Sequence, residues 1–224
     1  MHYAAYIFDM DGTLVDNMVY HTHAWVELLS GYGLHIQPDE FMRDTAGKIN
    51  GEILRQYVSP DMSDEEVLEA GERKEAHYRE LYTPVLASIE GLDEFLEKAK
   101  SAGIKLALGT AANEKNIEFI LIGLGLENAF DAIVGNHIVP VGKPSPDIFL
   151  KCASLLQVAP ELCLVFEDAP AGVEAARRAG MKAAVITSSL ASHEVRDLPH
   201  VVSVEPNFTR LLPLIGKTIG ERSE

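Results

Sequence analysis

Five short apolar runs, separated by longer amphipathic stretches, constrain the fold more than any other feature of the sequence. The runs span residues 4–8, 104–108, 132–134, 163–166 and 183–186. Their apolar residues are continuous rather than alternating with polar ones, as in parallel strands that helices cover on both faces. Three of the helical stretches between them end at a glycine, a residue that tolerates the left-handed conformation after the last helical turn. The sequence therefore predicts an α/β fold built on a doubly wound parallel sheet.

One long interval interrupts this alternation. From about residue 16 to residue 82 no strand pattern occurs, and helical patterns instead cover residues 21–29, 51–57 and 63–81. Ser63 and Glu66 have the spacing of a capping box at the start of the third pattern. We expect a small α-helical domain of residues 16–83, inserted into an α/β core made of residues 1–15 and 84–224.

The composition argues against two large classes of function. The sequence has 224 residues, with 19 Lys and Arg against 34 Asp and Glu, so the formal net charge is −15. A protein that binds duplex nucleic acid needs a basic surface to replace phosphate counterions, and this acidic balance argues against one. No run approaches the roughly 18–20 apolar residues of a membrane-spanning helix.

The start of the chain and its cysteines favour a cytoplasmic protein. Residues 1–8 lack the basic region and the long apolar region of a secretory signal. Cys152 and Cys163 form neither a disulfide framework nor a CxxC pair, so we expect buried free thiols. Because the pattern shows no surplus apolar face, we expect a monomer or a weak homodimer.

Reactive side chains follow four of the predicted strands at the point where each strand ends. In chain order they are Asp9 with Asp11, Thr110, Lys143, and Glu167 with Asp168. Taken singly, Thr110 suits a helix N-cap and Lys143 suits the surface. The carboxyl ends of parallel strands meet at one edge of a sheet, where α/β proteins bind their ligands. We therefore interpret the four sites together as one active site.

These residues resemble the motifs of the haloacid dehalogenase-like hydrolase superfamily, and more narrowly those of its β-phosphoglucomutase-like branch. The resemblance spans almost the whole chain and rests on Asp9-Met10-Asp11-Gly12-Thr13, Thr110, Gly142-Lys143-Pro144-Ser145-Pro146-Asp147 and Glu167-Asp168-Ala169-Pro170-Ala171-Gly172. It implies a Rossmann-like core, a mobile cap formed by the inserted helices, and an enzyme that transfers phosphoryl groups. Asp11 supports phosphoryl transfer, because the dehalogenases of this superfamily characteristically lack the second aspartate.

The expected chemistry gives each core residue a role. Asp9 is the candidate nucleophile, whose carboxylate attacks phosphorus and forms an aspartyl-phosphate. Asp11 is the candidate general acid and base, which protonates the leaving oxygen and then deprotonates the attacking water. An ordinary Asp has a pKa of about 3.9, so holding Asp11 protonated near pH 7 costs roughly 4 kcal/mol and requires a closed site. By resemblance, Thr110 and the backbone amides around Ala111 hold the phosphoryl oxygens, and Lys143 neutralises the charge that develops during transfer.

Charge counting predicts a metal ion. Asp9, Glu167 and Asp168 contribute three negative charges, and a phosphoryl dianion adds about two more. Lys143 supplies only one positive charge against them. A hard divalent cation with oxygen ligands, Mg²⁺, is therefore expected. By resemblance its ligands are the carboxylates of Asp9 and Asp168, the main-chain carbonyl of Asp11, and Glu167 either directly or through water.

The inserted helices should select the substrate, since the core motifs are generic. His21 resembles a residue at the entrance of the family's site, and Lys74 resembles a lysine of the mutases that contributes to acid–base gating. We interpret Trp25, which shares a helix face with His21, as packing inside the cap. The charged run at residues 64–75, which includes Lys74, is most simply a solvated helix face.

The segment 44–51 favours a phosphatase over a mutase. In β-phosphoglucomutases the matching loop presents a lysine and an arginine to the second phosphate of a bisphosphate intermediate. Aligned on Gly47, this sequence has Ala46 and Asn50 at those positions, and Lys48 supplies one positive charge in a shifted register. Loss of a bidentate arginine is not a conservative change. We expect Gly47 and Lys48 to contact the substrate.

These observations predict a Mg²⁺-dependent phosphatase that acts on a small phosphorylated metabolite, such as a sugar phosphate. A β-phosphoglucomutase-like mutase is the main alternative, followed by a pyrophosphatase and by a non-catalytic phosphometabolite-binding protein. The presence of Asp11 argues against the last of these, because binding alone needs no acid–base aspartate.

Overall fold

The core of the structure is a six-stranded parallel sheet. The computed structural model describes residues 2–45, 48–139, 141–188 and 195–216. The strands are β1 (Ala5–Phe8), β2 (Lys105–Gly109), β3 (Ala132–Val134), β4 (Cys163–Glu167), β5 (Lys182–Ile186) and β6 (Val201–Glu205), in the spatial order β3-β2-β1-β4-β5-β6. All neighbouring pairs are parallel. The predicted doubly wound α/β fold is confirmed.

The sixth strand is missing from the sequence-based prediction. β6 pairs with β5 at the edge of the sheet, and a register shift interrupts the pairing between Ala183 and Ala184. Its sequence, Val201-Val202-Ser203-Val204-Glu205, contains two polar residues and does not read as a continuous apolar run.

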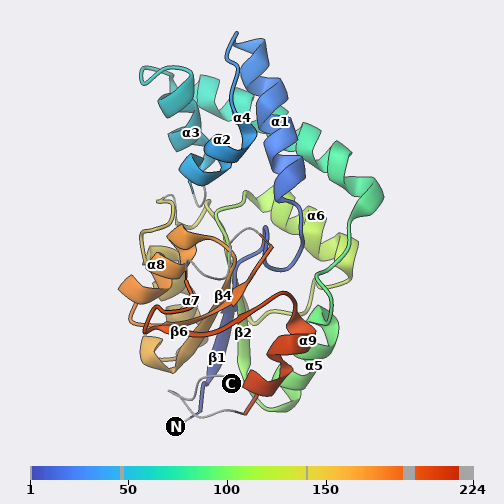
Figure 1. Cartoon of the computed structure of the whole chain (residues 1–224), viewed down its shortest axis with the longest axis vertical. Helices are drawn as coiled ribbons and strands as arrows, with labels where there is room; N and C mark the ends of the chain where they lie inside the picture. Colours follow the sequence, from blue (N-terminus) through green and yellow to red (C-terminus); the bar gives the residue numbers. More distant parts are fainter. Residues whose placement is uncertain (1, 46–47, 140, 189–194, 217–224) are drawn as a thin grey trace.

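Helices cover both faces of the sheet (Figure 1). On one face, α5 (Leu92–Ser101), α6 (Glu114–Leu124) and α9 (Phe208–Leu211) bury a cluster that includes Tyr6 and Phe8 of β1. On the other, α7 (Asp147–Leu156) and α8 (Pro170–Arg178) bury a cluster that includes Ala5 and Ile7 of the same strand. Because successive strand residues point to opposite faces, two buried faces require the continuous apolar runs seen in the sequence. Short 3₁₀ turns complete the core at Thr83–Val85, Pro160–Leu162 and Leu212–Leu214.

Four further helices form a layer beyond the carboxyl ends of the strands, at the top of Figure 1. This helical layer consists of α1 (Met18–Gly31), α2 (Pro38–Thr45), α3 (Asn50–Tyr57) and α4 (Asp64–Tyr82), of which the sequence did not predict α2. It has its own apolar cluster, in which the Trp25 and Phe41 rings lie 5.8 Å apart. The capping box at Ser63 and Glu66 is present. The division into a core and an inserted domain at residues 16–83 stays a prediction.

Two smaller expectations concern the described residues. Cys152 and Cys163 are buried and free, as predicted. No helix in the described part of the chain is long and apolar enough to cross a membrane.

Candidate active site

The predicted site residues meet in one cavity between the sheet and the helical layer. In the strand order, β2 and β3 lie on one side of β1 and β4 to β6 on the other, so the topological switch lies between β1 and β4. A cavity of about 520 Å³ opens there. Its walls include Asp9, Asp11, His21, Lys48, Thr110, Ala111, Lys143, Glu167 and Asp168. Gly47, the remaining predicted contact, lies outside the described residues.

Lys143 bridges two buried carboxylates at the sheet end of the cavity. Asp9 directly follows β1, Glu167 is the last residue of β4, and Lys143 lies in the segment that leads into α7. The Lys143 Nζ contacts Asp9 Oδ1 and lies 2.6 Å from Glu167 Oε1. Burial disfavours the ammonium, but the two carboxylates outweigh it and raise the pKa of Lys143. Lys143 is 5% exposed, so it is a buried charged side chain and the interpretation as a surface lysine is wrong.

The sheet end of the cavity is short of positive charge. Burial raises the pKa of Asp9 well above its ordinary value, Lys143 opposes this shift, and the nearby Glu167 and Asp168 carboxylates add to it. Oxygen atoms of Asp9, Glu167 and Asp168 lie within 4.8 Å of one another. Three clustered carboxylate oxygens suit a hard divalent cation, which would offset the same excess negative charge. The residues present therefore fit a Mg²⁺ ion.

Two glycines make space for Glu167, the last residue of β4, and for Asp168, which follows it. A Cβ at Gly12, whose φ is +82°, would lie 2.1 Å from Asp168 Oδ2. A Cβ at Gly172 would lie 1.8 Å from Glu167 Oε1. Glu167 Oε2 accepts hydrogen bonds of 2.8 Å from the backbone amides of Asp168 and Ala169. The glycines of the two acidic motifs thus make space for carboxylates that the backbone holds in place.

Two side chains at the start of the helical layer hold Asp11: Asn17, which precedes α1, and His21 of α1. Asn17 Nδ2 donates to Asp11 Oδ1 at 2.6 Å, and His21 Nε2 lies 3.5 Å from the same oxygen. Burial acts to raise the pKa of Asp11, but His21 and Asn17 outweigh it, so the pKa lies below its ordinary value. Asp11 is therefore ready to act as a base, whereas the expected acid role requires that it first gain a proton. The sequence did not identify Asn17, whose side chain is fully buried.

His21 and Lys74 face the cavity together. Lys74 Nζ lies 2.6 Å from His21 Nδ1, and the His21 ring stacks on Tyr78 at a centroid distance of 3.7 Å. Since an ammonium only donates hydrogen bonds, Nδ1 is the acceptor in this contact. Lys74 is 3% exposed. The interpretation of this part of α4 as a solvated face is therefore wrong.

Glu75 is the main site residue that the sequence-based prediction did not include. It is 5% exposed, lines the cavity and lies beside Lys74 on α4. The spacing of Gly71, Tyr78 and Tyr82 indicates a buried helix face, because positions three, four and seven residues apart lie on the same side of a helix. That face includes positions 74 and 75.

Thr110 and Lys48 complete the predicted set. Thr110 Oγ1 accepts a hydrogen bond of 3.1 Å from the Ala112 amide, whereas the N-cap of α6 is Asn113. The helix-cap explanation of Thr110 is therefore wrong. Lys48 lies at the cavity wall, and its Nζ donates to Gln56 Oε1 at 2.7 Å.

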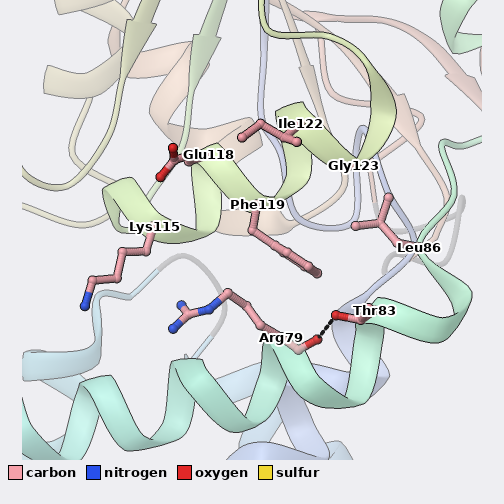
Figure 2. Close-up of a pocket in the computed structure, with 8 residues that line it drawn as sticks. All are labelled: Arg79, Thr83, Leu86, Lys115, Glu118, Phe119, Ile122 and Gly123. Atoms are coloured by element: carbon pink, nitrogen blue, oxygen red, sulfur yellow. Dashed lines mark hydrogen bonds between the residues drawn. The ribbon is translucent and has the colours of Figure 1, made fainter.

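A second cavity, of about 580 Å³, lies between α4 and α6 (Figure 2). Its walls include Arg79, Lys115 and Phe119 but none of the predicted site residues. Both cations have partners, since Arg79 donates to Asn116 Oδ1 at 2.6 Å and Lys115 pairs with Glu72 at 2.5 Å. The acidic cluster of Asp9, Glu167 and Asp168 lines the first cavity and not this one.

Comparison with known proteins agrees with the geometry. The family model for haloacid dehalogenase-like hydrolases matches residues 3–180. The chain belongs to this family. Over 183 residues it is 37% identical to fructose-1-phosphate phosphatase YqaB of Escherichia coli, covering 81% of this chain and 95% of that protein. Over 182 residues it is 35% identical to a phosphorylated carbohydrates phosphatase of Thermotoga maritima, covering 80% and 82%.

A solved structure extends the similarity to nearly the whole chain. The β-phosphoglucomutase of Clostridium difficile superposes with a TM-score of 0.82 at 28% identity, covering 96% of this chain and 97% of that one. The predicted resemblance to the β-phosphoglucomutase-like branch is confirmed. The chain is an enzyme of the phosphatase type within this family, with a mutase as the alternative.

Proposed function

We propose that this protein is a Mg²⁺-dependent phosphatase that hydrolyses monophosphate esters of small, sugar-like metabolites through an aspartyl-phosphate on Asp9. The observation that carries the proposal is the arrangement at the sheet end of the cavity. Lys143 joins Asp9 to Glu167, carboxylate oxygens of Asp9, Glu167 and Asp168 lie within 4.8 Å of one another, and Asp11 faces the same cavity.

The reaction proceeds in two steps that each use Asp11. In the first, a carboxylate oxygen of Asp9 bonds to phosphorus, the bond from phosphorus to the ester oxygen breaks, and Asp11 gives its proton to that oxygen. In the second, water attacks the phosphorus, Asp11 takes a proton from it, and inorganic phosphate leaves Asp9. Asp11 ends the cycle protonated, as it began.

The low pKa of Asp11 is compatible with this cycle. His21 and Asn17 favour the carboxylate, whereas a bound phosphate dianion disfavours it, because a nearby like charge raises the pKa of an acid. Substrate binding thus promotes the protonation that the first step needs. His21 Nε2, 3.5 Å from Asp11 Oδ1, lies beside the carboxyl group throughout the cycle.

The metal and Lys143 balance the charge of the transferred group. Asp9, Glu167 and Asp168 would hold Mg²⁺, which supplies positive charge against the phosphoryl oxygens when bound. Lys143 neutralises charge beside the nucleophile, and Thr110 with the amide of Ala111 contacts the remaining oxygens. The helical layer acts as the cap that excludes water from this site.

Hydrolysis is favoured over mutase chemistry by the position of Asn50. Its amide donates to Glu75 Oε1 at 2.8 Å and presents no cation to a second phosphate. The two phosphatases named above are also 37% and 35% identical to this chain. A mutase would be recognised by interconversion of sugar phosphate isomers that depends on a catalytic bisphosphate.

A substrate panel with Mg²⁺ tests the proposal. The panel contains sugar and polyol monophosphates, bisphosphates and pyrophosphate, and phosphate release is measured for the wild type and Asp9→Asn. We expect hydrolysis of monophosphates by the wild type and a loss of at least about a thousandfold in the variant. Asp93→Asn, an exposed change on α5, is the matched control and should keep full activity. Absence of turnover in the wild type, or full activity in Asp9→Asn, would contradict the proposal.

A further inference from the structure

A buried ion pair forms the wall of the cavity opposite the acidic cluster. Lys74 and Glu75 are adjacent on α4, both line the cavity, and they are 3% and 5% exposed. Lys74 Nζ lies 3.1 Å from Glu75 Oε1. The phosphoryl-transfer steps described above do not use Glu75, so its charge at this position needs a separate explanation.

Glu75 connects three helices at the cavity. Its Oε1 accepts a 2.8 Å hydrogen bond from Asn50 Nδ2 of α3, and its Oε2 accepts a 2.6 Å hydrogen bond from Asn116 Nδ2 of α6. Burial by itself would raise the pKa of Glu75, but Lys74 and His21 outweigh burial and lower it to about 2. The side chain is therefore a fixed carboxylate at neutral pH.

This carboxylate cancels the charge of Lys74. The two side chains together contribute no net charge where the leaving group of a substrate would lie, whereas a free Lys74 ammonium there would attract an anion. Three other cations line the cavity, Arg43, Lys48 and Lys143. Lys143 is already paired with Asp9 and Glu167. Arg43 is exposed, and Lys48 is partly exposed and donates to the neutral Gln56 side chain, so solvent screens both charges.

We propose that Glu75 determines the substrate class: by neutralising Lys74 it selects phosphomonoesters with an uncharged, hydroxyl-bearing leaving group and rejects those that carry a second phosphate or a carboxylate. This inference rests on the proposed phosphatase function. An anionic leaving group would lose its hydration beside a buried carboxylate and, among the described residues of the cavity, would gain no buried unpaired cation in return. A hydroxyl group, in contrast, can hydrogen-bond to the polar groups of this wall.

Matched substrate pairs test the proposal. Suitable pairs are fructose 1-phosphate with fructose 1,6-bisphosphate, glucose 6-phosphate with glucose 1,6-bisphosphate, and glycerol 3-phosphate with 3-phosphoglycerate. The pair whose neutral member is hydrolysed fastest is used, and the anionic-to-neutral ratio of kcat/KM is measured. In the wild type we expect a ratio below about one tenth. Such a tenfold preference for the neutral substrate requires only a modest difference in binding free energy.

Two variants change the charge of the wall by different routes. Glu75→Gln removes the negative charge at constant shape, and Asn50→Lys adds a positive charge next to Glu75. We expect each variant to raise the ratio at least tenfold. Glu72→Gln removes a carboxylate of the same helix that pairs with Lys115 outside the active-site cavity, and it should leave the ratio unchanged.

The outcomes separate this inference from the proposed function. If no neutral ester is hydrolysed, the proposed function fails. If neutral esters are hydrolysed but the wild-type ratio is near one, or if Glu75→Gln slows both substrates equally and leaves the ratio unchanged, the inference is overturned and the function stands. Should Glu75→Gln fail to fold, an unchanged ratio in Asn50→Lys overturns the inference by itself.

Discussion

Replacing Gly172 by Ala tests whether Glu167 is fixed in the way that the structure describes. A Cβ at this position would lie 1.8 Å from Glu167 Oε1, whereas ordinary contacts begin at 3.4 Å, so the carboxylate must move by roughly 1.6 Å. Gly172 lies in α8 without a positive φ, so backbone strain does not contribute. The effect of the substitution is therefore steric and directed at one carboxylate.

The magnitude follows from the contacts that this movement breaks. Glu167 accepts hydrogen bonds from Lys143 at 2.6 Å and from the amides of Asp168 and Ala169 at 2.8 Å. A hydrogen bond to a charged group contributes about 1.5–3 kcal/mol, so losing two of them costs about 3–6 kcal/mol. Alanine in place of glycine in a helix returns about 0.5–1 kcal/mol. We expect Gly172→Ala to lower the free energy of unfolding by about 2–5 kcal/mol.

Urea unfolding at pH 7, followed by circular dichroism, measures this difference. Gly31→Ala is the matched control, because Gly31 is also helical and a Cβ there meets nothing within 4 Å. The control should be as stable as the wild type or slightly more stable. Equal stability of the two variants would refute the reasoning, since it would mean that Glu167 moves away without losing bonds.

Three further predictions concern pH, the substrate and the metal. The folded-state pKa of Glu75 is lowered from 4.5 to about 2. Its contribution of about 3 kcal/mol to the free energy of unfolding is therefore present above pH 4.5 and lost as the pH falls from 4.5 toward 2. Urea unfolding of the wild type and Glu75→Gln across this range checks this, and the same pH dependence of stability in both proteins would contradict it. Lys48→Ala should raise KM a few-fold and leave kcat unchanged, because Lys48 lies at the cavity wall and already donates to Gln56; a large fall in kcat would contradict this. Gly12→Ala should raise the Mg²⁺ concentration for half-maximal activity at least about tenfold, because the new Cβ displaces Asp168; an unchanged Mg²⁺ titration would show that Asp168 is not a ligand.

The sheet end of the site was predictable because the sheet itself was predictable. Continuous apolar runs identify buried parallel strands, and residues that follow such strands meet at one edge. Asp9, Lys143 and Glu167 come from distant parts of the sequence, yet this one rule brings them together, and the structure joins them through Lys143. The core elements that the prediction lacked are the edge strand β6, whose polar residues interrupt its apolar run, and the short helix α9 that follows it.

The helical end of the site was not predictable by the same rule. A charged residue on a helix is usually solvated, and α4 begins with a long charged run. Lys74 and Glu75 are exceptions because other helices cover them. The packing of α4 against α1 and α6 is a tertiary contact, which the sequence of α4 alone does not predict. The helical spacing of Gly71 and Tyr78 marks the buried face but does not say that it lines a cavity.

The two ends of the cavity differ in charge, and under the proposed function this difference orients the substrate. At the sheet end, three carboxylates that could hold a metal ion face one lysine, so that end suits a group that binds a cation and accepts many hydrogen bonds. At the helical end, Lys74 and Glu75 cancel each other, so that end favours a polar group without charge. A sugar monophosphate has the same asymmetry, with a dianion at one end and hydroxyl groups at the other. Such a molecule gains the most binding free energy when its phosphate lies against Asp9. This is the orientation that the attack on phosphorus requires.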